Sequence, residues 1–309
     1  MVTAIQANID EPDSPRSSPL RDYLQLTKPR IVVLLIFTTV TAMVIAAEGK
    51  PLPPLVLAAT ILGGSLAAGG ASALNQYIDR DLDKLMSRTR NRPIPAGRVT
   101  PINGLIFGLA LLAWSAFLLT WLVNPLTAFL AMLGAVYYVF VYTILLKRNT
   151  VVNILIGGGA GAIPVLVGWA AVRGGLNLQP FLLFAIIFYW TPPHSWALAL
   201  LVNSDYEAAH VPMMPAARGP EVTRLQILMY SVQLILLTLI PVLLPAQYRM
   251  LGGFYLYAAA LLGVGLLFEA IALLREATKA AARRLYRYTT MYLALLFLAM
   301  MVDQLFFRR

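Results

Sequence analysis

Long apolar stretches alternate with short polar segments rich in charge, Pro or Gly along the whole chain. A helix needs roughly 20 residues to cross a hydrocarbon core of about 30 Å. The stretches that meet this length are 31–47, 55–77, 102–123, 126–146, 151–172, 181–202, 225–244, 251–274 and 286–307. The pattern therefore predicts an all-α membrane protein with nine transmembrane helices.

The composition agrees with a chain whose main solvent is lipid. Hydrophobic residues make up 59% of the 309 residues and charged residues only 12%, which excludes a soluble domain. The absence of cysteine excludes disulfides, thiolate metal sites and cysteine nucleophiles. The net charge of +10 is typical of membrane topology and anionic partners in such a chain, so we expect membrane lipid, not nucleic acid, as a partner.

The first 22 residues are polar, acidic and rich in Pro, and they lack the apolar core of a signal peptide. We expect residues 1–25 to form a disordered polar tail and residues 26–309 to form one polytopic domain. Most of the 24 Lys and Arg residues lie in this tail and in alternate loops. The positive-inside rule then places the N-terminus in the cytosol, and the acidic tail favours the plasma (inner) membrane of a prokaryote over an organelle.

The densest polar segment, residues 75–93, follows the second predicted helix. If the helix continues, Asn75, Asp79 and Asp83 lie on one face at i, i+4 and i+8, whereas Asp81 points elsewhere. Neighbouring carboxylates repel one another unless a cation lies between them. Oxygen ligands without Cys or paired His favour Mg²⁺, which commonly carries a diphosphate.

Basic residues surround this face, and two more follow a later apolar helix on the same side. They are Arg80, Lys84, Arg88, Arg90, Arg92, Lys147 and Arg148. Metal and arginines together are typical of a polyanion site. The alternatives are a solvated loop whose charges pair with one another and, for the later pair, a simple topological anchor.

The spacing Asn75-xxx-Asp79-xxx-Asp83, followed by Arg-Thr-Arg-Asn-Arg-Pro-Ile-Pro-Ala-Gly at 88–97, resembles the signature of the UbiA-type intramembrane prenyltransferases. The resemblance implies nine helices around a central cavity and Mg²⁺, held by Asn75, Asp79 and Asp83, that ionises an isoprenyl diphosphate. It also implies diphosphate contacts from Arg80, Lys84, Arg88, Arg92, Lys147 and Arg148.

Several stretches resemble the branch of this family that acts on haem: 142–150 with Asn153, 157–161, Pro164, 168–171, 190–199, 205–206 and 211–215. Ser195 and His210 depart from it, because that branch usually has Phe and Gly there. The resemblance implies transfer of a farnesyl group from farnesyl diphosphate to a vinyl group of haem B, with water addition, giving haem O and diphosphate. It further implies haem A synthase as a downstream partner.

His194 is the only histidine in a predicted span, and Pro192 and Pro193 beside it are expected to break the helix. His194 either ligates haem iron or handles a proton, and the alternative is a neutral histidine bonded to a carbonyl. We expect Trp190 and Trp196 beside the haem. Asp205, in a second polar loop, is a further candidate metal ligand, although Ala209 at i+4 gives it no acidic partner.

Two other functions stay open. One is a prenyltransferase of the same type with another acceptor, a quinone precursor or chlorophyllide. The other is a haem-handling assembly protein or transporter without enzymatic activity. Runs of small residues at 63–72 and 157–161 fit either close helix packing or a substrate groove.

Overall fold

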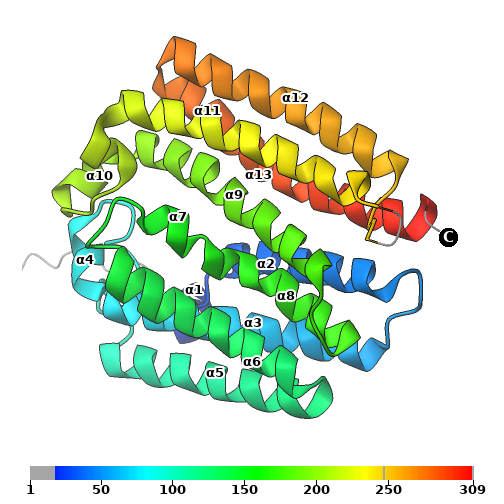
Figure 1. Ribbon diagram of the computed structural model, residues 1–309. Helices are drawn as coiled ribbons and strands as arrows, with labels where there is room; N and C mark the ends of the chain where they lie inside the picture. Colours follow the sequence, from blue (N-terminus) through cyan, green and yellow to red (C-terminus); the bar gives the residue numbers. More distant parts are fainter. Residues whose placement is uncertain (1–17, 246–247, 308–309) are drawn as a thin grey trace, which may run out of the picture.

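The computed structural model describes residues 18–245 and 248–307, and these residues form helices and loops without a strand (Figure 1). The helices are α1 (Pro19–Leu26), α2 (Pro29–Ala47), α3 (Pro54–Ile78), α4 (Arg80–Leu85), α5 (Pro101–Leu122), α6 (Pro125–Val136), η1 (Tyr137–Leu146), α7 (Asn153–Gly157), α8 (Gly159–Arg173), α9 (Leu178–Leu201), α10 (Asn203–Ala208), α11 (Met214–Leu243), α12 (Gly253–Glu276), α13 (Lys279–Val302) and η2 (Asp303–Phe307). η1 and η2 are π-helices that continue α6 and α13.

The predicted membrane fold is confirmed. Eight of the predicted spans correspond to helical segments of the described chain that are long and apolar enough to cross a membrane. The remaining span is α9, whose 24 residues extend about 36 Å but include a polar Thr-Pro-Pro-His stretch. Helices α11 and α13 begin well before the predicted 225 and 286, because charged residues in these early segments, such as Arg218, Glu221 and Lys279, lower their hydropathy.

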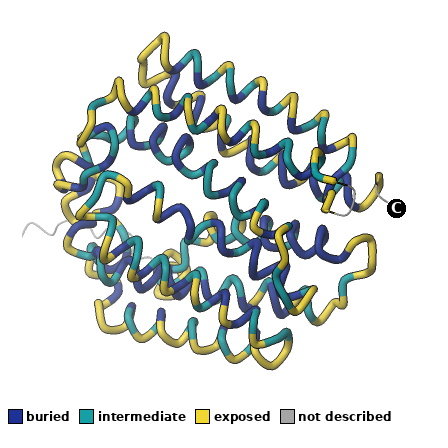
Figure 2. Tube along the Cα trace, viewed as in Figure 1, coloured by how far each residue is buried: buried dark blue, intermediate teal, exposed yellow. Residues whose placement is uncertain are grey.

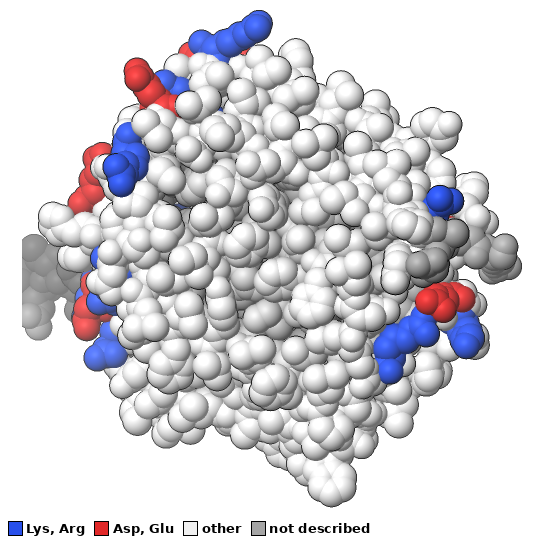
Figure 3. All heavy atoms as spheres, in the orientation of Figure 1, with Lys and Arg blue, Asp and Glu red and all other residues white. Residues whose placement is uncertain are grey.

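The long helices lie side by side, with short connections at the two ends of the molecule (Figure 1). Many side chains on the outer surfaces of α5 and α12 are exposed and apolar (Figure 2). Charged side chains gather at the two ends, and the wide band between them is free of charge on the face shown in Figure 3. This distribution fits a helical bundle whose middle is surrounded by hydrocarbon.

The predicted disordered tail is wrong in its last part, because Pro19–Leu26 form α1. Ser18 caps this helix by accepting a hydrogen bond from the Arg21 amide (3.4 Å). Asp22 pairs with Arg98 (2.8 Å), and Leu26 is fully buried, so α1 is attached to the loop after α4. Residues 1–17 lie outside the described residues, and the prediction for them stays a prediction.

The helix continues through the polar motif with a small irregularity. Asp79 lies between α3 and α4, yet its amide donates to the Asn75 carbonyl (2.9 Å), and the Asp83 amide donates to the Asp79 carbonyl (2.7 Å). These i→i−4 bonds keep the three side chains in helical register. In contrast, the expected break at Pro192 and Pro193 is wrong, since α9 runs through both prolines.

A π-helix sets the position of the second basic pair. In η1 the amide of Lys147 donates to the Tyr142 carbonyl (2.8 Å), five residues earlier. The ring of Tyr142 approaches the backbone at Gly157 so closely that a Cβ there would lie 2.2 Å from Cδ2 of Tyr142. The small-residue run thus allows η1 and the break between α7 and α8 to pack together at this point.

Candidate active site

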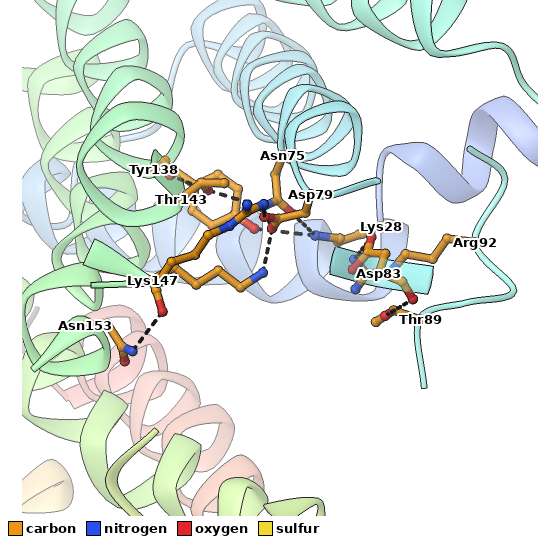
Figure 4. A network of polar contacts seen from close by, with 11 residues as sticks. Lys28, Asn75, Asp79, Asp83, Thr89, Arg92, Tyr138, Thr143, Lys147 and Asn153 are labelled. Carbon is orange, nitrogen blue, oxygen red and sulfur yellow. Dashed lines mark hydrogen bonds and ion pairs between the residues drawn. The ribbon is translucent and has the colours of Figure 1, made fainter. Parts of the chain in front are cut away.

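Asp79 is the centre of a buried polar network at the C-terminal end of α3 (Figure 4). Its Oδ2 accepts hydrogen bonds from Lys147 Nζ (2.5 Å) and Asn75 Nδ2 (2.8 Å). Its Oδ1 accepts from a guanidinium nitrogen of Arg148 (3.1 Å). A carboxylate with no exposed surface is thereby paired with two cations that lie about 70 residues away in sequence.

Asp83, one helical turn further, is 1% exposed and pairs with Arg92 (2.8 Å). The backbone carbonyl of Asp83 also accepts a hydrogen bond from the Thr89 hydroxyl (2.9 Å). These two contacts fold the loop after α4 back onto the helix end, so Arg92 reaches the cluster (Figure 4).

Lys28 belongs to this network although sequence reasoning missed it. Its ammonium donates to Asn75 Oδ1 (3.0 Å) and lies 3.4 Å from the Tyr138 hydroxyl. Burial, together with the nearby cations Arg92 and Lys147, lowers the pKa of Lys28 from 10.5 to about 7 against the opposing effect of Asp83 and Asp79. An anion bound beside Lys28 would favour its charged form.

The cluster has more positive than negative charge. Lys28, Arg92, Lys147 and Arg148 surround the two carboxylates of Asp79 and Asp83. Desolvated cations in excess favour an anionic ligand, and carboxylate and amide oxygens are ligands that Mg²⁺ prefers. The arrangement therefore fits a metal-bound diphosphate, because the cations would pair with the phosphate oxygens and the carboxylates would bind the metal.

The structure does not bring all the predicted basic residues to this cluster. Arg80 donates to the Tyr77 carbonyl (2.8 Å) and lies over the Tyr77 ring, and Lys84 is 58% exposed beside Asp81. Arg88 is exposed, and its backbone amide donates to Asp205 (3.3 Å). Arg80 and Lys84 point in other helical directions than Asp79 and Asp83, and Arg88 lies in the loop after α4. None of the three contacts either carboxylate among the described residues.

Asp205 packs against the loop after α4, not against the two buried carboxylates. It accepts hydrogen bonds from the Ser87 hydroxyl (2.8 and 2.9 Å) and from the Arg88 amide (3.3 Å). Its neighbour Asn203 donates to Glu207 (2.6 Å). The second polar loop thus lies next to the first, but its acidic residue is partly exposed and has hydroxyl and amide partners.

An apolar cavity of about 260 Å³ reaches the cluster at Lys28 and Tyr138. Its walls come from α2, α3, α6 and α8, and small residues form much of them: Gly64, Ala67, Ala68, Ala71, Ala131, Gly134, Ala135, Ala160 and Gly161. Thr39, at the far end of the lining on α2, lies about 16 Å from Lys28 along the helix axis. Both small-residue runs of the sequence contribute to this cavity.

His194 lies between two aromatic rings at the contact of α9 with α13. The ring of Trp190 is 4.3 Å and that of Tyr286 is 4.7 Å from the imidazole, and both are nearly parallel to it. His194 Nδ1 lies 3.0 Å from Thr289 Oγ1, whose single proton is donated to the Tyr286 carbonyl. This pairing of Thr289 favours the tautomer with the imidazole proton on Nδ1, in which Nε2 is an acceptor or metal ligand.

Trp190 and Trp196 do not share one site. Trp190 donates to the Thr289 carbonyl (2.7 Å) beside His194. Trp196 is 1% exposed and makes an edge contact with Tyr230 of α11, and its indole nitrogen has no hydrogen-bond partner among the described residues. Six helical residues separate the two indoles, which turns them to different faces of α9.

A buried carboxylate pair among cations, next to an apolar cavity in a bundle of membrane-length helices, defines a class of intramembrane enzyme. Residues 35–299 match the UbiA prenyltransferase family, and the chain belongs to that family. A relative from Gloeobacter violaceus, named protoheme IX farnesyltransferase, is 49% identical over 291 residues, which cover 94% of each chain.

A relative of the same name from Roseiflexus sp. is 48% identical over 292 residues, which cover 94% of this chain and 54% of that protein. This chain therefore spans about half the length of several curated relatives that it matches. The fold is also similar to that of a UbiA homolog from Archaeoglobus fulgidus solved with DMAPP and Mg²⁺. The TM-score is 0.62 at 14% identity, and the match covers 90% of this chain and 99% of the other.

Proposed function

We propose that this protein transfers a farnesyl group from farnesyl diphosphate to a vinyl group of haem B, and that water addition then gives haem O and diphosphate. The observation that carries the proposal is the Asp79–Lys147–Arg148 cluster at the end of the apolar cavity. The choice of haem as acceptor rests on the names of the relatives, which are 48–49% identical to this chain over more than 90% of its length.

The diphosphate end of the donor fits the polar cluster. Lys28, Arg92, Lys147 and Arg148 supply hydrogen-bond donors for its oxygens and stabilise the charge that develops as the allylic C–O bond breaks. Asp79 and Asp83, assisted by Asn75, would hold Mg²⁺, which when bound neutralises the diphosphate as a leaving group. The Archaeoglobus protein, which has a similar fold, was solved with Mg²⁺ and DMAPP, and this supports the use of a divalent metal with an isoprenyl diphosphate.

The hydrocarbon end of the donor fits the apolar cavity, where small side chains leave room and exclude bulk water. Exclusion of water protects the allylic cation until the haem vinyl carbon attacks it. His194, with Nε2 available and its ring held by Trp190 and Tyr286, is our candidate contact to the haem. Asp205 stays a candidate second-loop ligand only if it turns away from Ser87.

The cavity predicts the chain-length preference for the donor. A Cβ built on Gly161 meets no heavy atom within 4 Å, and Gly161 lines the cavity. Gly161→Phe is therefore expected to fill the cavity without a backbone clash and to reduce kcat/KM for farnesyl diphosphate by about 100-fold, a loss of roughly 2.7 kcal/mol. Gly161→Ala is the control and should change it less than threefold. Equal losses with dimethylallyl and farnesyl diphosphate would contradict this role of the cavity.

The imidazole of His194 predicts a spectroscopic result. His194→Phe keeps a stacking ring between Trp190 and Tyr286 but removes Nε2. If Nε2 ligates the iron, the Soret band of bound haem B should shift and its affinity should fall by about 10-fold or more. His210→Phe is the matched control, because His210 is exposed on the loop after α10. An unchanged Soret band would assign the histidine a role other than ligation.

An acceptor panel tests the function. Purified protein with farnesyl diphosphate and Mg²⁺ would be offered haem B, a quinone precursor or chlorophyllide, and the extracts separated by chromatography. We expect a new product with haem B alone. Prenylation of another acceptor would keep the enzyme class and change the substrate, whereas no product with any acceptor would favour a haem-handling protein without activity.

We also propose the cellular setting. The cluster, α4 and α10 share one end of the molecule (Figure 1), and the basic loops are expected at the cytosolic side of a prokaryotic plasma membrane, together with the N-terminus. The haem O that leaves the site would serve a haem A synthase. Reporter fusions to the N-terminus and to the loop between α2 and α3 would report opposite sides of the membrane if this orientation is correct.

A further inference from the structure

A second cavity, of about 410 Å³, lies among the ends of five helices at the same end of the molecule as α4 and α10 (Figure 1). Its walls come from the end of α9, α10, the first part of α11, the end of α12 and the start of α13. The helix break at Gly219, where φ is 85°, turns α11 so that Pro220 lines the cavity. It shares no lining residue with the apolar cavity and is more polar.

Two cations in this cavity lack a charged partner. Arg224 and Lys279 line it, and neither forms an ion pair within the described chain. Nε of Arg224 is buried without a hydrogen-bond partner. Glu207 is the one carboxylate in the lining, and its Oε1 already accepts from Asn203 (2.6 Å). A buried guanidinium N–H that lacks an acceptor favours a ligand with anionic oxygens.

The cavity lies in line with the His194 site. Lys279, Ala282, Tyr286 and Thr289 are spaced i, i+3, i+7 and i+10, so they share one face of α13. Tyr286 and Thr289 contact His194, and Lys279 and Ala282 line the cavity. The ring of Tyr286 that stacks on the imidazole thus lies about 10 Å further along α13 than Lys279.

We infer that the pocket of Arg224 and Lys279 binds the propionate carboxylates of the haem acceptor, with the porphyrin ring directed along α13 toward His194. This inference rests on the proposed function. The chemistry that the pocket recognises is a pair of anionic oxygen groups, and a phospholipid phosphate is the other source of such a group at this depth. Two carboxylates on one edge of a flat apolar ring fit two cations at the mouth and aromatic rings further in.

Haem dimethyl ester, which keeps the porphyrin and iron but lacks both carboxylates, provides the test. Binding of haem B and of the ester to the purified full chain in detergent would be followed by absorption titration, with and without phosphatidylglycerol. The wild type is expected to bind haem B about 10-fold or more tightly than the ester. The double variant Arg224→Gln/Lys279→Gln should bind haem B and the ester equally. The conservative single variant Arg224→Lys should keep part of the preference for haem B over the ester. Arg283→Gln, exposed on α13 outside the pocket, is the control.

The activity readout separates the two proposals. The double variant should raise the KM for haem B while keeping kcat at saturating haem. A double variant that still prefers haem B over the ester overturns the inference and leaves the proposed function intact. Phosphatidylglycerol that stabilises the wild type but not the double variant, with unchanged haem affinity, overturns it in favour of lipid. A wild type that binds and farnesylates neither haem overturns the proposed function and this inference with it.

Discussion

Asp79→Asn is expected to lower kcat for farnesyl transfer by on the order of 1000-fold. The carboxylate accepts from Lys147, Asn75 and Arg148, and it is the buried group best placed to hold a metal against a diphosphate. The amide keeps the shape but removes the charge, and its NH2 group turns a donor toward one of the two cations that the carboxylate accepts from. Steady-state assays with haem B and farnesyl diphosphate over a range of Mg²⁺ concentrations would measure the loss.

Asp81→Asn is the matched control, because Asp81 lies two residues away with its side chain 73% exposed beside Arg80 and Lys84. It should retain wild-type activity within about threefold. Size-exclusion profiles and thermal unfolding of both variants would establish that they fold. Equal activity of the two variants would mean that the reaction does not depend on the buried cluster.

Lys147→Met is expected to reduce kcat by about 100-fold or more, since it removes an ammonium 2.5 Å from Asp79 while keeping most of the apolar stem. The variant should mainly slow the step in which the C–O bond to diphosphate breaks. Single-turnover reactions measure this step without product release. Lys84→Met removes the same group from an exposed position beside Asp81 and should stay within about threefold of wild type. A larger loss in Lys84→Met than in Lys147→Met would restore Lys84 to the diphosphate site.

The helical part of the site could be predicted because its spacing is local. Asn75, Asp79 and Asp83 recur every four residues, and the i→i−4 bonds across Asp79 keep that register in the structure. The same phase already argues against Arg80 and Lys84, each of which is turned by about 100° from the carboxylate before it. For Arg80 and Lys84, the direction of the side chain on the helix therefore predicts contact with the cluster better than closeness to Asp79 and Asp83 in the sequence.

The rest of the site depends on contacts between distant segments. Lys28 precedes Asn75 by 47 residues, and a basic residue before an apolar stretch has the same pattern as a topological anchor. The π-helix that directs Lys147 toward Asp79 has no local sequence signal. Likewise, the two prolines beside His194 gave the wrong expectation of a helix break, because packing of α9 against α11 and α13 keeps the helix continuous.

Product analysis with the purified protein tests most directly whether the Asp79 cluster catalyses farnesyl transfer to haem B. Haem B, farnesyl diphosphate and Mg²⁺ would be incubated with wild type and with Asp79→Asn, and haems and released diphosphate would be quantified by mass spectrometry and a phosphate assay. We expect haem O and diphosphate in equal amounts from wild type, loss of both products with a chelator, recovery with Mg²⁺, and neither product from Asp79→Asn. Unmodified haem B from a folded wild type, or haem O formed equally by Asp79→Asn, would contradict this expectation.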